Sequence, residues 1–176
     1  MQKNIIIIGA GGHGLVLYEL AKAIGHHVIG FIDDHKPKGS TIVDDCTVLG
    51  DTHQLDEYHN DKSLHFVLAM GDNKMRQALA TRYKTLSFVT LVHPSAYLSP
   101  SSTLGEGTVV LPHVIVQANA VIGDHVILNN GAIIEHDVTI EDYTHIGSGC
   151  VIGSNATVRQ STTLDYGVVA KRNTTI

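Results

Sequence analysis

The chain contains 176 residues, which is enough for one large or two small domains. Hydrophobic residues make up 43% of it and charged residues 16%, a balance typical of a compact folded protein rather than a disordered one. The net charge is -5, and no segment is rich in Lys and Arg, so the sequence lacks the basic surface that binding to nucleic acid requires. We therefore expect no nucleic-acid partner.

The two cysteines and the N-terminal residues bear on the cellular compartment. Cys46 and Cys150 lie in different halves of the chain and outside any Cys-x-x-Cys pattern, which argues against a zinc ribbon and against a disulfide framework. The apolar run at residues 5–8 is too short for a signal peptide or a membrane span. These features predict a cytoplasmic protein with reduced thiols and no membrane insertion.

The N-terminal half alternates apolar strands with helical segments. Strands are predicted at residues 4–8, 27–32, 65–70 and 87–92. Helices are predicted at 13–24 and 73–83, and the section 33–61 is polar and rich in turn residues. Buried apolar strands that alternate with helices are typical of a parallel sheet covered by helices. Residues 1–92 are therefore predicted to form a small Rossmann-like α/β domain, a truncated version of a doubly wound fold.

From Ala96 onward, the sequence repeats with a period of six residues. Every sixth position from Leu98 to Ile176 forms a column of fourteen residues, thirteen of which are large aliphatics. The column two residues earlier, from Ala96 to Thr174, contains only small or β-branched residues. Two restricted columns at one spacing indicate a repeat architecture.

A period of six fits neither an α-helix, which repeats near 3.6 residues, nor a plain strand, in which every second residue shares a face. Six residues suit one side of a triangular coil, whose interior receives the large aliphatic side chain beside the small residue two places earlier. Stacked coils bury what one coil alone cannot. Fourteen repeats on three sides give between four and five coils. Residues 93–176 are therefore predicted to form a left-handed parallel β-helix of hexapeptide repeats.

A glycine-rich loop follows the first predicted strand. Gly9, Gly11 and Gly14 match the pattern G-x-G-x-x-G at the start of a helix. Glycines there permit a tight turn and let backbone N–H groups approach phosphate oxygens. Asp33 stands 19 positions after Gly14, at the end of the second strand, and suits ribose hydroxyls. By itself the loop indicates either a dinucleotide such as NAD or a simple strand-to-helix turn.

Four short segments, of which the glycine loop is the first, follow one another in a characteristic order along nearly the whole chain. They are 8–14, 31–34, 69–73 and 133–137, the last followed by His145 and Ile146. Together with the repeats, they make the chain resemble the hexapeptide-repeat sugar O-/N-acyltransferases, in particular the family of sialic acid O-acetyltransferases and UDP-amino-sugar N-acetyltransferases. The resemblance implies acetyl-CoA as co-substrate, no metal, and a homotrimer in which acetyl-CoA and sugar meet between neighbouring subunits.

The resemblance shifts the expected ligand of the glycine loop from NAD to the nucleotide of an activated sugar. It implies seven contacts to that substrate, from Gly11, Gly12, His13, Asp33, Asp34, Gly71 and Asn73. The loop residues would lie at the phosphates, and the two aspartates at the ribose or uridine. All seven belong to the carboxyl edge of the predicted sheet, where open α/β folds bind ligands. Arg76 either adds a cation there or is a solvated helix residue.

Acetyl transfer from a thioester to an amine or a hydroxyl requires the acceptor to lose a proton, and histidine is the usual base near neutral pH. Among the twelve histidines, His136 is followed by Asp137 and matches the family's Ile-Glu-His-acid motif. His136 is therefore the expected general base, and Asp137, where the family usually has glutamate, is expected to fix its tautomer. The hexapeptide register places His136 on an outward corner, so a solvated histidine without a role is the alternative.

For acetyl-CoA, the resemblance implies contacts from His145, Gly147 and Gly153. Backbone N–H groups near Gly147 are candidates for stabilising the oxyanion of the tetrahedral intermediate. Asn129 either helps to shape the cleft or only forms a turn. The expected acyl-donor site therefore lies on the coils that follow His136.

Three other functions fit parts of the sequence. A zinc site of the gamma carbonic anhydrase type needs three convergent histidines, and the spacings of 12, 11 and 9 residues between His113, His125, His136 and His145 fit it poorly. An NAD-dependent oxidoreductase would need a substrate domain unlike a β-helix.

The chain also lacks the Gly-Val-Pro-Ala-Lys segment that usually closes the family's acyl-CoA site, so the main alternative is a nucleotide-sugar-binding or scaffolding relative with impaired catalysis. The identity of the sugar and the choice between N- and O-acetylation stay open.

Overall fold

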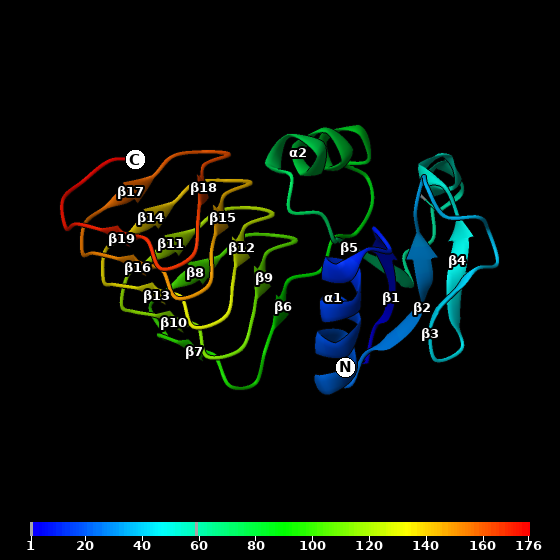
Figure 1. The fold of residues 1–176 in the computed structure, drawn as a ribbon, viewed down its shortest axis with the longest axis horizontal. Coiled ribbons are helices and arrows are strands. Elements are labelled where there is room, and N and C mark those ends of the chain that lie inside the picture. The colour runs from blue at the N-terminus through cyan, green and yellow to red at the C-terminus, as the bar shows by residue number, and fades with distance from the viewer. Residues whose placement is uncertain (1, 59) are drawn as a thin grey trace. The chain divides into compact units, whose positions relative to one another are not determined.

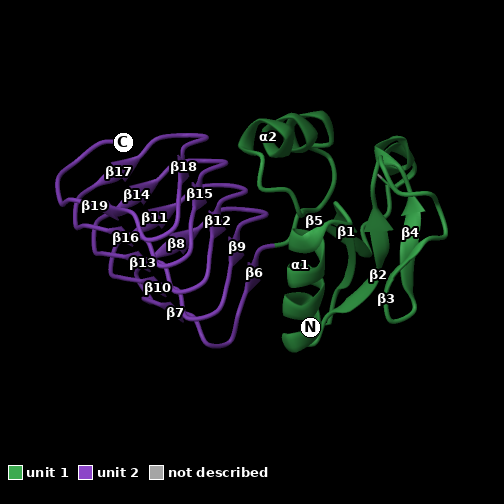
Figure 2. Ribbon diagram, in the orientation of Figure 1, with its two compact units in different colours: residues 1–89 green, residues 90–176 purple. Residues whose placement is uncertain are grey.

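The computed structural model describes residues 2–58 and 60–176. The chain divides into two compact units, residues 1–89 and residues 90–176, which Figure 2 colours separately. Among the described residues, no helix is both long enough and apolar enough to span a membrane.

The first unit is built on a five-stranded sheet (Figure 1). Its strands are β1 (Asn4–Ile8), β2 (His27–Ile32), β3 (Thr41–Val43), β4 (Cys46–Gly50) and β5 (Leu64–Leu68), in the order β3-β4-β2-β1-β5. All paired strands are parallel except β3, which runs antiparallel to β4. The helices are α1 (Gly12–Ala23), α2 (Asn73–Arg82) and the short 3-10 helix η1 (Thr52–Glu57). This arrangement confirms the predicted Rossmann-like α/β fold.

The core of the first unit forms around β1, the strand between β2 and β5. Its residues 5–8 are each at most 1% exposed. An apolar run without alternation is typical of a strand that is buried on both faces. Helix α1 packs against β1 and β2 and buries Leu17, Leu20 and Ala21. The apolar spacing of α1 therefore fixes which of its faces meets the sheet.

The section 33–61 is predicted to consist of turns, but it contains three elements. β3 and β4 form a hairpin, and Asp44 at its turn has a left-handed backbone with φ of 47°. η1 begins at a capping box, in which Asp51 and Gln54 each accept a hydrogen bond from the other's backbone N–H. The strands are only three and five residues long, too short for the apolar alternation on which strand prediction depends.

The predicted strand at 87–92 does not form as one strand. Phe88 makes a single bridge to Phe66 of β5, whereas β6 (Leu91–Val92) pairs with β9 (Val109–Val110) of the second unit. The two units therefore divide after Val89 rather than after residue 92. An apolar run cannot reveal where a chain passes from one sheet to another, because both sheets require buried side chains.

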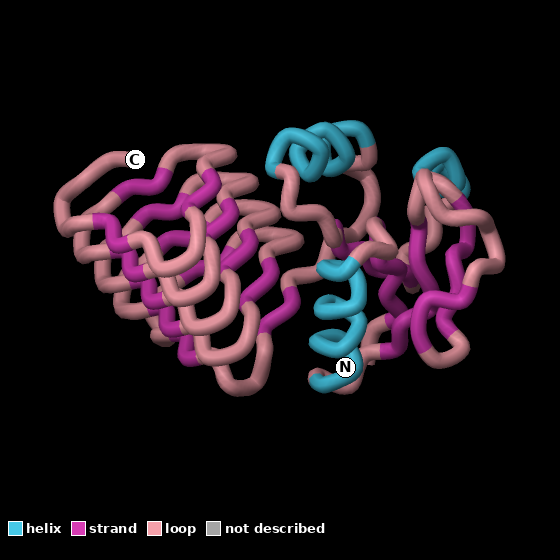
Figure 3. The backbone as a smooth tube through the Cα atoms, viewed as in Figure 1, coloured by secondary structure: helices cyan, strands magenta, loops and turns pink. Residues whose placement is uncertain are grey.

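The second unit is a left-handed parallel β-helix, and Figure 3 shows its strands stacked in successive coils. Its two-residue strands after β6 are β7 (Tyr97–Leu98), β8 (Thr103–Leu104), β9 (Val109–Val110), β10 (Ile115–Val116), β11 (Val121–Ile122), β12 (Ile127–Leu128), β13 (Ile133–Ile134), β14 (Thr139–Ile140), β15 (His145–Ile146), β16 (Val151–Ile152), β17 (Thr157–Val158), β18 (Thr163–Leu164) and β19 (Val169–Ala170). They form three sheets, in the orders β19-β16-β13-β10-β7, β17-β14-β11-β8 and β18-β15-β12-β9-β6. Paired residues such as Ile115 and Ile133 are 18 positions apart, so three six-residue sides make one coil.

The two predicted columns fill the interior of the β-helix. The aliphatic column is at most 2% exposed from Val110 to Val158, and the small-residue column is at most 1% exposed from Thr108 to Ala156. Burial decreases only toward the ends of the stack, where Ile176 is 39% exposed. The prediction of a hexapeptide β-helix is confirmed.

Each corner of the β-helix contains one residue with a left-handed backbone, at every sixth position from 107 to 173, with φ between 53° and 68°. These residues are Gly107, His113, Asn119, His125, Gly131, Asp137, Tyr143, Gly149, Asn155, Ser161, Gly167 and Asn173. Eight of the twelve are Gly, Asn or Asp, the types that tolerate this conformation best. The corner geometry thus imposes a third periodic constraint, and Asp137 satisfies it.

Candidate functional site

A cleft lies in the first unit at the carboxyl ends of β1, β2 and β5, and its volume is about 210 Å³. Its lining includes Gly9, Gly11, Asp33, Asp34, Thr52 and Met70. This edge of an open α/β sheet is where such folds bind ligands. The structure therefore brings together the start of α1 and the two aspartates that were predicted to contact a nucleotide.

The glycines of the loop before α1 fall into two classes. Gly9 has φ of 110°, and a Cβ on Gly14 would collide with the backbone oxygen of Gly9, so the packing of loop on helix requires both. Around Gly11 and Gly12, by contrast, no atom beyond the adjacent residues and the backbone of α1 lies within 4 Å of the position that a Cβ would occupy. The fold alone therefore does not account for Gly11 and Gly12, and their open surroundings suit the close approach of a ligand. His13, which follows them, is partly buried in the first turn of α1.

Asp33 joins the end of β2 to the glycine loop. Its Oδ2 accepts a hydrogen bond of 2.8 Å from the N–H of Ala10, and its Oδ1 accepts two from the N–H groups of His35 and Lys36, at 2.9 and 3.1 Å. Burial alone would raise the pKa of Asp33, but the three backbone donors outweigh it and hold that pKa below its usual value. Asp33 is therefore ionised at neutral pH, and it is a structural residue as well as a wall of the cleft.

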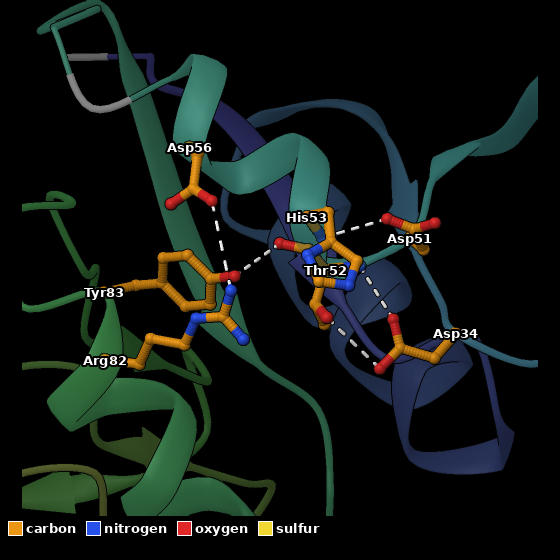
Figure 4. A network of polar contacts seen from close by, with 7 residues as sticks. All are labelled: Asp34, Asp51, Thr52, His53, Asp56, Arg82 and Tyr83. Carbon is orange, nitrogen blue, oxygen red and sulfur yellow. Dashed lines mark hydrogen bonds and ion pairs between the residues drawn. The ribbon is translucent and has the colours of Figure 1, made fainter.

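Asp34 also lines the cleft and at the same time holds the start of η1 (Figure 4). Its Oδ1 and Oδ2 accept hydrogen bonds from the N–H and the hydroxyl of Thr52, at 2.7 and 3.2 Å. The carbonyl of Thr52 accepts a buried hydrogen bond of 2.7 Å from the Tyr83 hydroxyl at the end of α2. These hydrogen bonds connect Asp34 in the cleft wall, through Thr52, to the end of α2. Thr52 was not predicted, and no local motif marks it.

Gly71 and Asn73 lie where the chain passes from β5 into α2. Gly71 is exposed, but Asn73 is 7% exposed, and its Oδ1 accepts a hydrogen bond of 2.7 Å from Nη2 of Arg76. Arg76 is 1% exposed and also donates from Nη1 to the carbonyl of Met70, at 2.9 Å. Arg76 is therefore not a solvated helix residue, and its guanidinium holds the carbonyl of Met70, a residue of the cleft lining. That it adds a cation to the site stays a prediction.

The second unit presents His136 at the corner between β13 and β14. Its Nδ1 lies 2.7 Å from Oδ2 of Asp137, and the two side chains are 52% and 43% exposed. An ionised carboxylate can only accept hydrogen bonds, so Nδ1 donates and Nε2 of the neutral ring carries the lone pair. The pair therefore has the geometry of a base and its orienting carboxylate at a surface that a substrate can reach.

The surroundings of Asp137 hold this pair in place. The hydrogen bond with His136, followed by one with Asn119, holds the pKa of Asp137 below its usual value. The N–H of Asp137 donates to the carbonyl of Ala118, and the carbonyl of His136 accepts from the N–H of Asn155, at 2.9 and 3.2 Å. Asn119 was not predicted. Its signal in the sequence is the spacing of one coil, 18 residues, before Asp137.

His145 and Asn129 lie away from the His136 corner. His145 begins β15, whose sheet differs from those of β13 and β14 on either side of His136. Its side chain is partly exposed. Asn129 accepts a hydrogen bond at Oδ1 from the N–H of the next residue, Asn130, at 2.9 Å. One chain alone therefore does not place His145 beside His136.

Gly147 and Gly153 are explained by the stacking of coils. Their N–H groups donate to the carbonyls of Leu164 and Ala170, both at 2.9 Å. A Cβ on either glycine would collide with the backbone of the following coil. The N–H of Gly147 itself is therefore not available to an oxyanion, and a role for other N–H groups near Gly147 stays a prediction.

The four histidines considered above as zinc ligands do not converge on a metal site. His113, His125 and His136 belong to three different corners, and His125 instead stacks on Tyr143 with ring centroids 5.5 Å apart. Over residues 2–58 and 60–176, no group of three or more His, Cys, Asp or Glu side chains is arranged to hold a metal ion.

Comparisons with known proteins connect both units to one family. Residues 4–83 match the family described as PglD N-terminal domain. Residues 119–154 and 131–165 match bacterial transferase hexapeptide repeats. The combination on one chain reproduces the order of domains that the sequence predicts.

Solved structures decide the assignment. A histidine-to-asparagine mutant of perosamine N-acetyltransferase from Caulobacter crescentus, in complex with CoA and GDP-perosamine, is 30% identical, with a TM-score of 0.86, and the match covers 98% of this chain and 84% of that one. The chain belongs to the hexapeptide-repeat sugar acetyltransferase family. Another member, the acetyltransferase domain of PglB from Neisseria gonorrhoeae in complex with acetyl coenzyme A, is 32% identical, with a TM-score of 0.77, and is covered over 89% of its length.

A curated relative in this family is UDP-N-acetylbacillosamine N-acetyltransferase from Bacillus subtilis. It is 35% identical over 109 residues, which make up 60% of this chain and 50% of the relative. The match thus spans about half the length of that curated relative.

Proposed function

We propose that this chain is an acetyl-CoA-dependent N-acetyltransferase that acts on the amino group of a nucleotide-linked amino sugar. One observation carries the proposal: His136 is paired with Asp137 at an exposed corner of a β-helix of this acetyltransferase family. The relatives from Caulobacter crescentus and Bacillus subtilis are N-acetyltransferases by name, which favours an amine over a hydroxyl of sialic acid as the acceptor. Relatives solved with CoA and with acetyl coenzyme A support the proposed donor.

In the proposed reaction, the neutral sugar amine attacks the carbonyl carbon of acetyl-CoA. The C–N bond forms, the C–S bond breaks, and CoA leaves as a thiolate. The amine must lose a proton as it attacks, and His136 accepts that proton at Nε2 while its Nδ1 donates to Asp137. The resulting imidazolium passes the proton to the thiolate, so the products are the N-acetylated sugar and CoA.

We assign the cleft of the first unit to the nucleotide of the substrate. Gly11 and Gly12 leave open space at the first turn of α1, whose N–H groups and dipole attract phosphate oxygens. The carboxylates of Asp33 and Asp34 line the same cleft, and each oxygen can accept more than one hydrogen bond. They are therefore suited to ribose hydroxyls or to the N–H groups of a base.

We also propose that the working enzyme is a homotrimer. His136 and His145 lie on different sides of the prism, so a site that uses both requires two chains. One sheet has only apolar side chains at its outward positions, which are Tyr97, Ile115, Ile133, Val151 and Val169. The two end members are 53% and 68% exposed, and such a continuous apolar surface suits contact with another copy. The two free cysteines suit the cytoplasmic location that we propose.

The direct test follows thiol release from acetyl-CoA with UDP-linked amino sugars, GDP-linked amino sugars and sialic acid as acceptors. We expect release with at least one nucleotide-linked amino sugar, and a product whose mass spectrum places one acetyl group on nitrogen. Turnover with sialic acid alone would contradict N-acetylation. Failure with every acceptor, together with retained binding of UDP or GDP, would contradict the enzyme and favour a binding or scaffolding relative.

A further inference from the structure

A polar column runs along the corner of the β-helix that carries His136. Its members follow one another at intervals of 18 residues, one in each coil: Ser101, Asn119, Asp137, Asn155 and Asn173. We call it the Asn119 column. Its last four members have left-handed backbones, each with φ of 59°. Asn and Asp suit that backbone, so corner geometry alone accounts for the residue types.

One side-chain contact in the Asn119 column goes beyond what the backbone requires. Nδ2 of Asn119 donates to Oδ1 of Asp137, at 3.1 Å, while Oδ2 of Asp137 is 2.7 Å from Nδ1 of His136. Among the described residues, the side chains of Asn155 and Asn173 make no hydrogen bond. The contact is therefore particular to the coil that directly precedes the His136 pair.

The contact matters because the Asp137 side chain is 43% exposed, so water competes for its oxygens. The terminal torsion of an aspartate is broad, and a carboxylate held through one oxygen can turn and withdraw that oxygen from its partner. A donor on the other oxygen opposes this rotation. Asn119 is itself held, because its N–H donates to the hydroxyl of Ser101 at 3.1 Å. Ser101 in the preceding coil thus helps to hold Asn119, and Asn119 in turn holds Asp137 in the following coil.

We propose that Asn119 is a positioning residue for acetyl transfer, because its amide fixes the Asp137 carboxylate so that Oδ2 stays on Nδ1 of His136 and Nε2 keeps its lone pair for the acceptor. The catalytic consequence rests on the acetyltransferase function proposed above. The effect on the tautomer of His136 does not depend on that function.

Two variants remove the contact without straining the corner. Asn119→Gly deletes the side chain at a φ that glycine adopts freely. Asn119→Ser leaves a hydroxyl that is shorter than the amide, and Ser161 with φ of 58° shows that a corner of this β-helix accommodates serine. Asn155→Gly is the matched control, since it makes the same deletion at the same φ on the other side of Asp137. Thermal unfolding identifies the variants that keep the fold.

The first readout is the nitrogen-15 NMR signal of the His136 ring, assigned by its loss in His136→Asn. The Nδ1–H tautomer of the neutral ring dominates in the wild type and in Asn155→Gly, and its population falls in both Asn119 variants. The second readout is steady-state kinetics. Because a hydrogen bond to a charged group is lost, kcat falls about threefold to tenfold, while KM for acetyl-CoA stays within about twofold.

The outcomes separate the two proposals. An unchanged tautomer in both Asn119 variants, or an equal change in Asn155→Gly, would overturn the role of Asn119. A wild-type chain without acetyl transfer would overturn the proposed function, and the NMR comparison would still decide whether Asn119 positions the pair. A fall in kcat with an unchanged tautomer would also contradict the mechanism, because the loss would then not pass through His136.

Discussion

The two units of this chain relate structure to chemistry in opposite ways. In the β-helix, three periodic constraints account for most positions: an aliphatic side chain inside, a small one beside it, and a left-handed residue at each corner. His136 belongs to none of them. In the α/β unit, the cleft residues Asp33 and Asp34 are also hydrogen-bonding residues of the fold. The proposed base is thus a residue that the β-helix does not need for its fold, whereas the proposed ligand contacts of the α/β unit come from residues that also stabilise that fold.

The difference teaches which residues can be changed separately. The side chain of His136 is 52% exposed at its corner, so we expect its removal to leave the stacking of coils intact. A cleft aspartate that accepts backbone hydrogen bonds contributes to stability, and under the proposed function it contributes to ligand binding as well. We therefore expect function and stability to separate in the β-helix and to change together in the α/β unit.

The largest expected effect tests this separation. His136→Asn should lower acetyl transfer about 10²- to 10⁴-fold, the usual contribution of a general base, without changing the midpoint of thermal unfolding. His113→Asn is the matched control, because His113 is also an exposed corner histidine and asparagine tolerates its φ of 61°. Thiol release and thermal unfolding measure both quantities. Equal activity in the two variants would remove His136 from the mechanism, and a loss of stability in His136→Asn would break the separation.

A substitution in the interior of the β-helix should show the reverse, a loss of stability that depends on whether the side chain points inward. Ile122 is 2% exposed and Val121, its neighbour in β11, is 48% exposed. Ile122→Ala should cost about 2–5 kcal/mol of unfolding free energy because it leaves a cavity, whereas Val121→Ala should cost less than about 1 kcal/mol. Urea unfolding followed by circular dichroism measures the difference. A similar cost at both positions would contradict the inward direction of the aliphatic column.

The contrast between the units also explains what could be predicted from sequence. A period of six sustained over fourteen repeats predicts the β-helix and its core, because each coil repeats the same packing demand. The same register places His136 outward, and the structure has it exposed. The partner of Asp137 was not predicted. The predicted coil of 18 residues places Asn119 beside Asp137, but the left-handed corner already accounts for an asparagine there, so nothing in the sequence distinguishes Asn119 from Asn155.

Less of the α/β unit could be predicted, because its contacts are not periodic. The position of Asn73 after β5 correctly indicates the edge of the sheet, but it does not reveal that Asn73 and Arg76 are buried against each other. The hydrogen bond of Tyr83 to Thr52 joins residues 31 positions apart, and no local pattern encodes it. Pairings of this kind depend on how the sheet closes.

Two glycines of the loop before α1 should give changes in stability of opposite sign when each is replaced by alanine. Gly14→Ala should destabilise the α/β unit by about 1–3 kcal/mol, because its Cβ meets the backbone oxygen of Gly9. Gly12→Ala has open space and should leave stability unchanged or raise it by up to about 1 kcal/mol. The same substitution should weaken the binding of UDP or GDP, measured by calorimetry. Tight nucleotide binding by Gly12→Ala would place the phosphates elsewhere.

The smallest expected effect concerns Asp33 and acid. Its pKa in the folded chain lies below the usual 3.8, so its contribution to stability is complete above that value and is lost as the pH falls through the lower folded pKa. Asp33→Asn should therefore cost about 1 kcal/mol at neutral pH and flatten the loss of stability below about pH 4, since asparagine keeps one acceptor but no charge. Urea unfolding from pH 3 to pH 7 measures both. Asp45→Asn is the control, because among the described residues the Asp45 side chain makes no hydrogen bond. Reduced nucleotide binding in Asp33→Asn, together with the lost stability, would confirm that this carboxylate serves both the cleft and the fold. A change in binding without a change in stability would contradict this, because function and stability would then be separable in the α/β unit, as we expect in the β-helix.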